Sequence, residues 1–104
     1  FYSAMAYPGS PLYAMAKQKG YPLPDDPGGP GWIGYSQHSY ECFPLPTDTI
    51  SAAEVLRFRD EAFMKYFTDH NYLSMMRRKF GERTVQHIQE MVSMPRLKRR
   101  ILGN

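Results

Sequence analysis

The sequence predicts a mainly α-helical chain, in which a small helical cluster follows a long loop and a strand–turn–helix unit comes first. Three observations predict this class. A short apolar run meets a turn and a helix start within residues 1–13. Residues 21–50 are dense in proline, glycine and aromatic side chains, and residues 51–94 carry apolar side chains at helical spacing. We therefore expect three segments, which are residues 1–20, 21–50 and 51–104.

The first segment has the pattern of a buried strand, a tight turn and a helix. Phe1–Met5 is apolar and partly aromatic, as a buried strand is, and Pro8–Gly9 ends it. Ser10 is a good N-cap, and Pro11 suits the first helical position. Gly20 is placed to close the helix. Because (β/α) barrels use such tight strand-to-helix turns at their functional rim, we expect a terminal piece of a partial barrel here.

The second segment is a loop whose composition argues against both a helix and plain disorder. Its many prolines and glycines break helices, whereas Trp32, Tyr35, Tyr40 and Phe43 bury a large area when they dock. Loops longer than about 15 residues usually serve a function or are disordered, so we expect an ordered loop that wraps over another surface. His38 is its candidate acid–base group or axial ligand, because histidine titrates near neutrality; the alternative is an ordinary hydrogen-bonded surface histidine.

The third segment is predicted to be helical. Ser51–Glu54 has the sequence of a capping box, and the apolar stripe behind it predicts a helix to about Asp69. Asn71 can cap a second helix that stops at Gly81, and a third ends before Pro95. Three amphipathic helices with short connections are expected to pack as a small antiparallel cluster. The first stripe comprises Ala52, Val55, Leu56, Ala62, Phe63, Tyr66 and Phe67.

The charges are unevenly distributed along the chain. Residues 71–104 carry eight basic and two acidic side chains, a net charge of +6, whereas residues 1–70 carry five basic and eight acidic ones, a net charge of −3. A basic end suits nucleic acid or an acidic partner, but solvated helix faces are commonly basic too. Arg59 is the charge out of place in the apolar stripe. It either packs its stem and pairs locally, or clamps an anionic group.

Other chemistries find little support in the sequence. Asp25-Asp26 lies among prolines without a histidine, and neither His70 nor His87 has a companion at metal-ligand spacing. Cys42 is the single cysteine, which excludes an internal disulfide framework and suits a reducing cytoplasm. No apolar run approaches the ~18 residues of a membrane span. Because the chain begins with Phe1 and shows no signal peptide, we expect a fragment of a longer cytoplasmic protein.

Four segments in order resemble a known family. They are Ala6–Tyr13 (AYPGSPLY), Gly34–Tyr40 (GYSQHSY), Leu45–Thr47 (LPT) and Ser51–Asp60 (SAAEVLRFRD). Together they are similar to the C-terminal end of cobalamin-binding radical S-adenosylmethionine (SAM) proteins. That group includes iron–sulfur oxidoreductases of the anaerobic magnesium-protoporphyrin ester cyclase type. The resemblance extends over most of the chain, from about residue 1 to about residue 102.

The resemblance implies a parent enzyme with SAM, a four-iron–four-sulfur cluster and cobalamin, acting as an oxidoreductase or a methyltransferase-like enzyme. Three cysteines spaced Cys-x-x-x-Cys-x-x-Cys hold the cluster in that family, so a chain with one cysteine cannot hold it. The segment Phe1–Pro8 corresponds to the last barrel strand. Contacts with the adenine of SAM are implied for Ala4, Met5, Ala6 and Tyr7; the alternative for Tyr7 is that its ring caps the barrel core. Because long aromatic loops often close over a substrate, contacts with substrate are expected for Trp32, Tyr35, His38 and Tyr40.

The resemblance thus predicts a non-catalytic piece that contributes a barrel rim and a helical cap. Its partners are the remainder of the barrel and the cobalamin domain, and it holds no cofactor of its own. The alternative is an independent helical binding module whose basic end contacts nucleic acid or an acidic protein. No helix-turn-helix or RNA-binding signature supports that alternative, and the aromatic residues are not interleaved with the basic ones.

Overall fold

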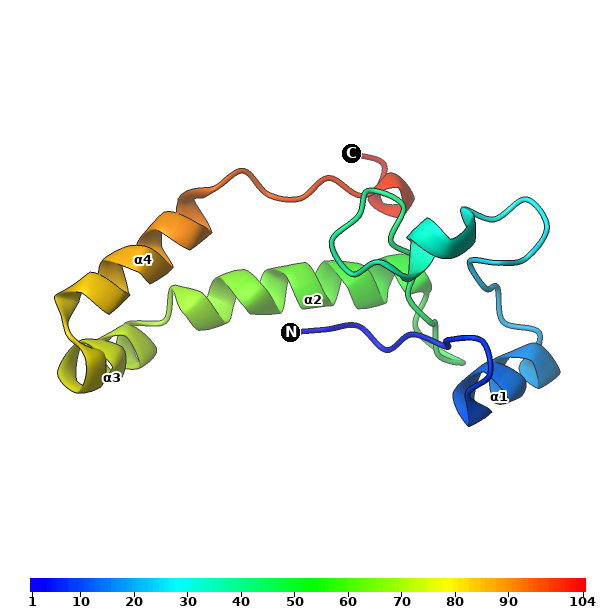
Figure 1. The fold of residues 1–104 in the computed structure, drawn as a ribbon, viewed down its shortest axis with the longest axis horizontal. Coiled ribbons are helices and arrows are strands. Elements are labelled where there is room, and N and C mark those ends of the chain that lie inside the picture. The colour runs from blue at the N-terminus through cyan, green and yellow to red at the C-terminus, as the bar shows by residue number, and fades with distance from the viewer. The chain divides into compact units, whose positions relative to one another are not determined.

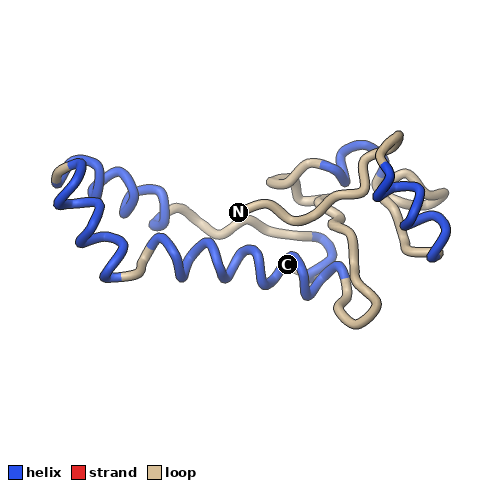
Figure 2. The backbone as a smooth tube through the Cα atoms, turned by 90° about the horizontal axis from the view of Figure 1, so that it is seen from below, coloured by secondary structure: helices blue, strands red, loops and turns tan.

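The computed structural model describes all 104 residues as helices joined by loops, with no strand (Figures 1 and 2). The predicted mainly helical class is therefore confirmed. The elements in chain order are α1 (Pro11–Lys19), the 3-10 helix η1 (Gly31–Tyr35), α2 (Ala52–Phe67), α3 (His70–Phe80), α4 (Glu82–Ser93) and the 3-10 helix η2 (Arg100–Leu102).

The chain forms two compact units, which are described separately. One consists of Tyr2–Arg59 and Leu97–Asn104 and is called the loop unit here. The other consists of Phe1 and Asp60–Arg96 and is called the helical unit. The loop unit holds the residues that the sequence singles out for function.

The strand predicted over Phe1–Met5 is not formed. A strand requires a ladder of backbone hydrogen bonds to a neighbouring strand, and this segment meets a side chain and a loop instead. The Ser3 amide donates to Gln37 Oε1 at 3.0 Å, and Gln37 Nε2 donates to the Ser3 carbonyl at 2.9 Å. The Leu45 amide donates to the Ala4 carbonyl at 3.0 Å. A carboxamide side chain thus takes the position of a partner strand.

The turn and helix that follow this segment form as predicted. The Ser10 side-chain oxygen accepts the Tyr13 amide at 3.1 Å and caps α1, whose first residue is Pro11. The Tyr7 carbonyl closes the turn by accepting the Ser10 amide at 3.1 Å. Gly20 ends the helix in the left-handed conformation at φ 75°, which glycine adopts without the strain that a side chain would cause.

The long loop is ordered by tight backbone packing, and it contains the short helix η1, which its glycines and prolines did not predict. A Cβ atom on Gly34 would lie 2.7 Å from Pro24 Cβ and 2.8 Å from Pro30 Cγ. The Gly34 carbonyl accepts the Phe43 amide at 2.8 Å, and the Pro24 carbonyl accepts the Gly31 amide at 2.7 Å. Glycine at position 34 is therefore required by close contact with two proline rings.

Two small apolar clusters form the core of the loop unit, and neighbouring residues of the N-terminal segment enter different ones. Met5 packs with Tyr35, Cys42 and Leu56, and Ile101 lies against them. Ala6 packs in the other cluster, with Leu12, Tyr13, Ala16, Tyr21, Leu23 and Leu45. Met5 and Ala6, although adjacent in the chain, are therefore buried in different clusters.

The helical unit is built from helices with local capping residues, of which α3 and α4 pack against each other. Asp69 caps α3 by accepting the Tyr72 amide at 2.9 Å, so this helix begins before the predicted cap at Asn71. Helices α3 and α4 pack together, with Val85 and Ile88 buried on α4. The unit also contains a group of aromatic rings in contact, which are Phe1, Phe63, Tyr66, Phe67 and Tyr72.

Helix α2 begins close to its predicted start and ends two residues before its predicted end. The Ser51 side-chain oxygen accepts the Glu54 amide at 3.2 Å, which is one half of the predicted capping box. The helix ends at Phe67, and the Thr68 side chain donates to the Met64 carbonyl at 2.7 Å. Helix α4 ends at Ser93, before Pro95, as the sequence predicts.

Candidate functional site

The segment predicted to contact a cofactor is half buried and half exposed. Met5 and Ala6 are buried, with 6% and 2% of their surfaces exposed, whereas Ala4 and Tyr7 are exposed. The backbone amides and carbonyls of Met5 and Ala6 form no hydrogen bond within the chain. Most buried backbone groups in proteins are paired, so these two residues are an exception that calls for a partner.

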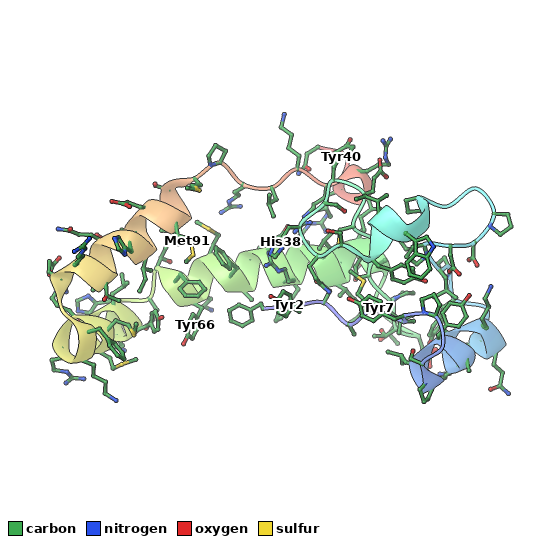
Figure 3. The ribbon with its side chains drawn as sticks, viewed as in Figure 1. Tyr2, Tyr7, His38, Tyr40, Tyr66 and Met91 are labelled. Carbon is green, nitrogen blue, oxygen red and sulfur yellow. The ribbon has the colours of Figure 1, made fainter.

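The structure brings this segment together with two of the predicted loop residues. The rings of Tyr7 and Tyr35 have centroids 5.4 Å apart, and those of Trp32 and Tyr35 are 5.7 Å apart. Tyr35 is buried, while Trp32 exposes 72% of its surface and Tyr7 48%. The result is an aromatic rim with one buried and two exposed rings (Tyr7 is labelled in Figure 3). Flat, exposed rings of this kind can stack on a planar or apolar ligand.

Asp25 lies at the base of this rim and was missed at the sequence level. Its carboxylate accepts the Tyr13 hydroxyl at 2.8 Å and the Tyr35 hydroxyl at 2.9 Å. The hydrogen bond from Tyr13, together with that from Tyr35, lowers the pKa of the carboxyl. Burial and the bond to Asp25 raise the pKa of the Tyr35 hydroxyl. The sequence analysis weighed the acidic pair only as metal ligands and found no companion for it, because nothing nearby in the sequence identifies a tyrosine as its partner.

His38 is exposed and lies beside Arg59 and Tyr2 (Figure 3). Arg59 Nη2 is 3.3 Å from His38 Nε2, and the ring centroids of His38 and Tyr2 are 6.3 Å apart. Since an arginine nitrogen only donates, a hydrogen bond in this contact requires Nε2 to accept. Arg59 itself is buried. Arg59, the one charge within the apolar stripe, therefore contacts His38, the candidate acid–base residue of the loop.

Tyr40, the fourth predicted loop residue, has different neighbours. Its ring centroid is 5.0 Å from the Arg100 guanidinium carbon, and its carbonyl accepts the Arg100 amide at 2.8 Å. Arg100 Nε donates to both carboxylate oxygens of Glu41, at 2.7 and 2.8 Å, which lowers the pKa of Glu41. No ring contact joins Tyr40 to His38 or Trp32, so the four predicted loop residues do not form one site.

A shallow depression of about 380 Å³ is lined in part by the Arg100–Glu41 pair. Its volume is at the lower end of the range for small-molecule sites. Prolines and glycines make up five of its eleven lining residues, and its charged side chains are Asp26 and the ion pair. Its lining residues are Pro22, Leu23, Asp26, Pro27, Gly28, Gly29, Pro30, Glu41, Phe43, Arg100 and Ile101.

The remaining candidates show ordinary structural roles. Cys42 is fully buried, and no group of three or more His, Cys, Asp or Glu side chains is arranged to hold a metal ion. His70 and His87 are exposed. Asp26 accepts the Leu23 amide at 2.8 Å and so supports a turn. None of the helices combines the length and the apolar character needed to cross a membrane.

The basic end is partly engaged within the chain. Arg77 Nε donates to Glu82 at 2.6 Å, and Arg100 pairs with Glu41. Arg99 is fully buried, with Nη1 donating to the carbonyls of Gln37 and Ser39. Sequence reasoning counted Arg99 only as part of a charged run, because its partners lie about 60 residues earlier.

Comparisons with protein-family models, with curated proteins and with solved structures found no match to this chain.

Proposed function

We propose that this chain is the C-terminal, non-catalytic part of a radical SAM, cobalamin-dependent iron–sulfur enzyme. In this proposal residues 1–20 contribute the last strand, turn and helix of a partial (β/α) barrel. Residues 21–50 form a loop at the substrate side, and residues 51–104 form a helical extension that caps the barrel. The remainder of the barrel and the cobalamin domain are its partners.

The observation that carries the proposal is the state of Met5 and Ala6. Their side chains are buried in two different apolar clusters, and their amides and carbonyls lack hydrogen-bond partners. Burial of successive side chains is typical of a strand inside a parallel sheet. A tight turn and an N-capped helix then follow, which is the order of a (β/α) unit. The missing partners are those that neighbouring barrel strands supply.

The cofactor residues in the proposal are limited to one wall of a SAM site. The half-exposed ring of Tyr7 and the unpaired backbone of Met5 and Ala6 suit contacts with the adenine, which is flat and carries both donors and acceptors. The iron–sulfur cluster does not fit this chain, because its one cysteine is buried and a cluster requires several thiolates. Cluster and cobalamin are therefore assigned to the remainder of the parent enzyme.

The alternative, a nucleic-acid-binding module, is less well supported. Arg77, Arg99 and Arg100 donate to groups within the chain rather than standing free for phosphates. Among the exposed aromatic rings, Tyr7 and Trp32 lie in the loop unit, and Phe80 is the one aromatic residue within the basic run at residues 77–83. Stacking and phosphate contacts are usually interleaved along a nucleic-acid groove.

The test is the coding sequence upstream of Phe1, followed by biochemistry on its product. We expect an in-frame (β/α) pattern with three cysteines spaced Cys-x-x-x-Cys-x-x-Cys. The anaerobically purified full-length protein should then contain about four iron atoms per chain and cleave SAM under reduction. In that protein Tyr7→Ala should raise the Kd for SAM by about tenfold, as loss of a stacking ring does, whereas Phe58→Ala should not. An initiator methionine close to Phe1 would contradict the proposal.

A further inference from the structure

Arg99 is the most unusual charged residue of the loop unit. Its side chain is fully buried, although it lies only five residues from Asn104. Nη1 donates to the Gln37 carbonyl at 2.8 Å and to the Ser39 carbonyl at 3.0 Å. The Arg99 amide donates to Asn104 Oδ1 at 2.7 Å. Burying a guanidinium is costly unless it is well hydrogen-bonded, so these contacts must be part of what keeps it inside.

The two carbonyls that Arg99 holds flank His38. One nitrogen therefore fixes the backbone on both sides of the histidine, in a stretch that has no regular secondary structure of its own. The His38 ring meets Arg59 Nη2 at 3.3 Å, from helix α2. The position of the ring thus depends on two arginines, one that contacts it and one that holds its backbone.

Gln37 extends this arrangement to the N-terminal segment. Arg99 holds the Gln37 carbonyl, while the Gln37 side chain forms two hydrogen bonds with the backbone of Ser3. Ser3 lies directly before the residues proposed as the SAM-facing rim. Next to Arg99, Arg100 holds the following part of the loop through the Tyr40 carbonyl and Glu41. The C-terminal residues therefore tie the loop and the N-terminal segment together.

We infer that Arg99 is a positioning residue, which holds residues 36–40 so that His38 meets Arg59 and Gln37 meets Ser3. The inference deepens the proposed function, in which this loop lies at the substrate side. The contacts themselves are formed within this chain and need no cofactor. The inference can therefore be tested on residues 1–104 alone, and its failure would leave the proposed function to its own test.

The experiment compares Arg99→Met and Arg99→Lys with Lys98→Met, an exposed basic neighbour. Amide hydrogen exchange and the NMR signals of the His38 ring are measured in each variant. The Cys42 amide donates at 3.2 Å to the Ser39 carbonyl, which Arg99 also holds. In Arg99→Met we expect the Cys42 and Ser3 amides to exchange about tenfold or more faster, as loss of a charged hydrogen-bond donor predicts, and the His38 ring signals to move. Amides in the middle of α2 should change little. Lys98→Met should behave as the wild type.

Gln37→Met distinguishes the contacts of the Gln37 side chain with Ser3 from the contacts of Arg99 with the loop carbonyls. It removes the hydrogen bonds to Ser3 but leaves the carbonyls that Arg99 holds. We expect faster exchange at Ser3 alone, with the His38 signals unchanged. Arg99→Lys keeps the charge but not the planar donor group, so its amide exchange and His38 signals should lie between those of wild type and Arg99→Met. It also serves as the folded variant if Arg99→Met unfolds. Unchanged His38 signals in Arg99→Lys and Arg99→Met, or an equal rise in exchange throughout α2 and the loop, would overturn the inference.

Discussion

At the scale of single residues, Asp25 connects elements of the loop unit through the hydrogen bonds of its side chain. Its carboxylate accepts hydroxyls from Tyr13 on α1 and Tyr35 on η1, so one side chain joins two elements of the loop unit. Tyr35 in turn carries the contacts to Tyr7 and Trp32. The aromatic rim therefore depends on a carboxylate that touches neither of its exposed rings.

Asp25→Asn should make the stability of the loop unit less dependent on acid pH. The hydrogen bonds from Tyr13 and Tyr35 hold the pKa of Asp25 below its ordinary value of 3.8 in the fold. The carboxylate therefore contributes its full stabilisation above pH 3.8 and loses it as the pH falls through the lower folded pKa. Urea unfolding of wild type and Asp25→Asn across this acid range measures the difference. If the unfolding free energies of wild type and Asp25→Asn fall equally as the pH is lowered, Asp25 contributes nothing to the acid sensitivity.

Tyr35→Phe provides a second residue-scale prediction at the other end of the pH range. Burial and the bond to Asp25 raise the pKa of the Tyr35 hydroxyl well above its ordinary value of 10.0. The protonated hydroxyl thus stabilises the fold at pH values below 10, and this contribution is lost as the pH rises beyond it. Tyr35→Phe should be less stable than wild type at pH 7, and the gap should narrow at strongly alkaline pH. A gap that is constant with pH would assign the loss to packing alone.

At the scale of elements, the sequence predicted what is decided locally. Ser10, Pro11 and Gly20 define α1, and the Ser51 cap starts α2, because each cap acts on an amide or carbonyl within one turn. The helix η1 and the cap at Asp69 were missed because glycine, proline and asparagine signals nearby competed with them. Element boundaries are where such competition has its largest effect.

Longer-range features could not be predicted in this way. The strand at the N-terminus did not form, since strand pairing depends on distant residues that the sequence pattern does not specify. Asp25 with its tyrosines, His38 with Arg59, and Arg99 with the loop carbonyls are contacts between elements. The sequence supplied His38 and Arg59 as separate candidates, and their contact became apparent only from the fold.

Helix α2 gives a matched pair of substitutions at the element scale. Leu56 is fully buried among Met5, Tyr35 and Cys42, whereas Phe58, two residues later, exposes 74% of its surface. Leu56→Ala should cost about 2–5 kcal/mol of unfolding free energy, through lost burial and the cavity left behind. Phe58→Ala should cost about 0.5 kcal/mol or less. Denaturant titrations followed by circular dichroism measure both, and equal losses would contradict the described core.

At the scale of the whole molecule, the two proposed roles predict different ligands. If the chain is an enzyme fragment, its basic end binds nucleic acid only through weak charge attraction, which collapses as salt rises. The isolated chain should also bind SAM with no saturation below about 1 mM, because most of the contacts of a SAM site lie outside it. Chemical-shift titrations with duplex DNA, single-stranded RNA and SAM test both points, with a variant carrying Ala at Arg77, Arg78 and Lys79 as the control. Micromolar binding of SAM, or binding of nucleic acid that persists at physiological salt and is lost in this variant, would overturn the assignment.

The central claim is that the N-terminal segment is a barrel strand without its neighbours, and amide hydrogen exchange at Met5 and Ala6 tests it most directly. In the isolated chain both amides should exchange about 100-fold faster than that of Leu56 in α2, because they are buried without a hydrogen-bond partner. In the proposed full-length enzyme they should become protected to a degree similar to Leu56. Protection of Met5 and Ala6 equal to that of Leu56 in the isolated chain would mean that the segment is already paired, and would contradict the account.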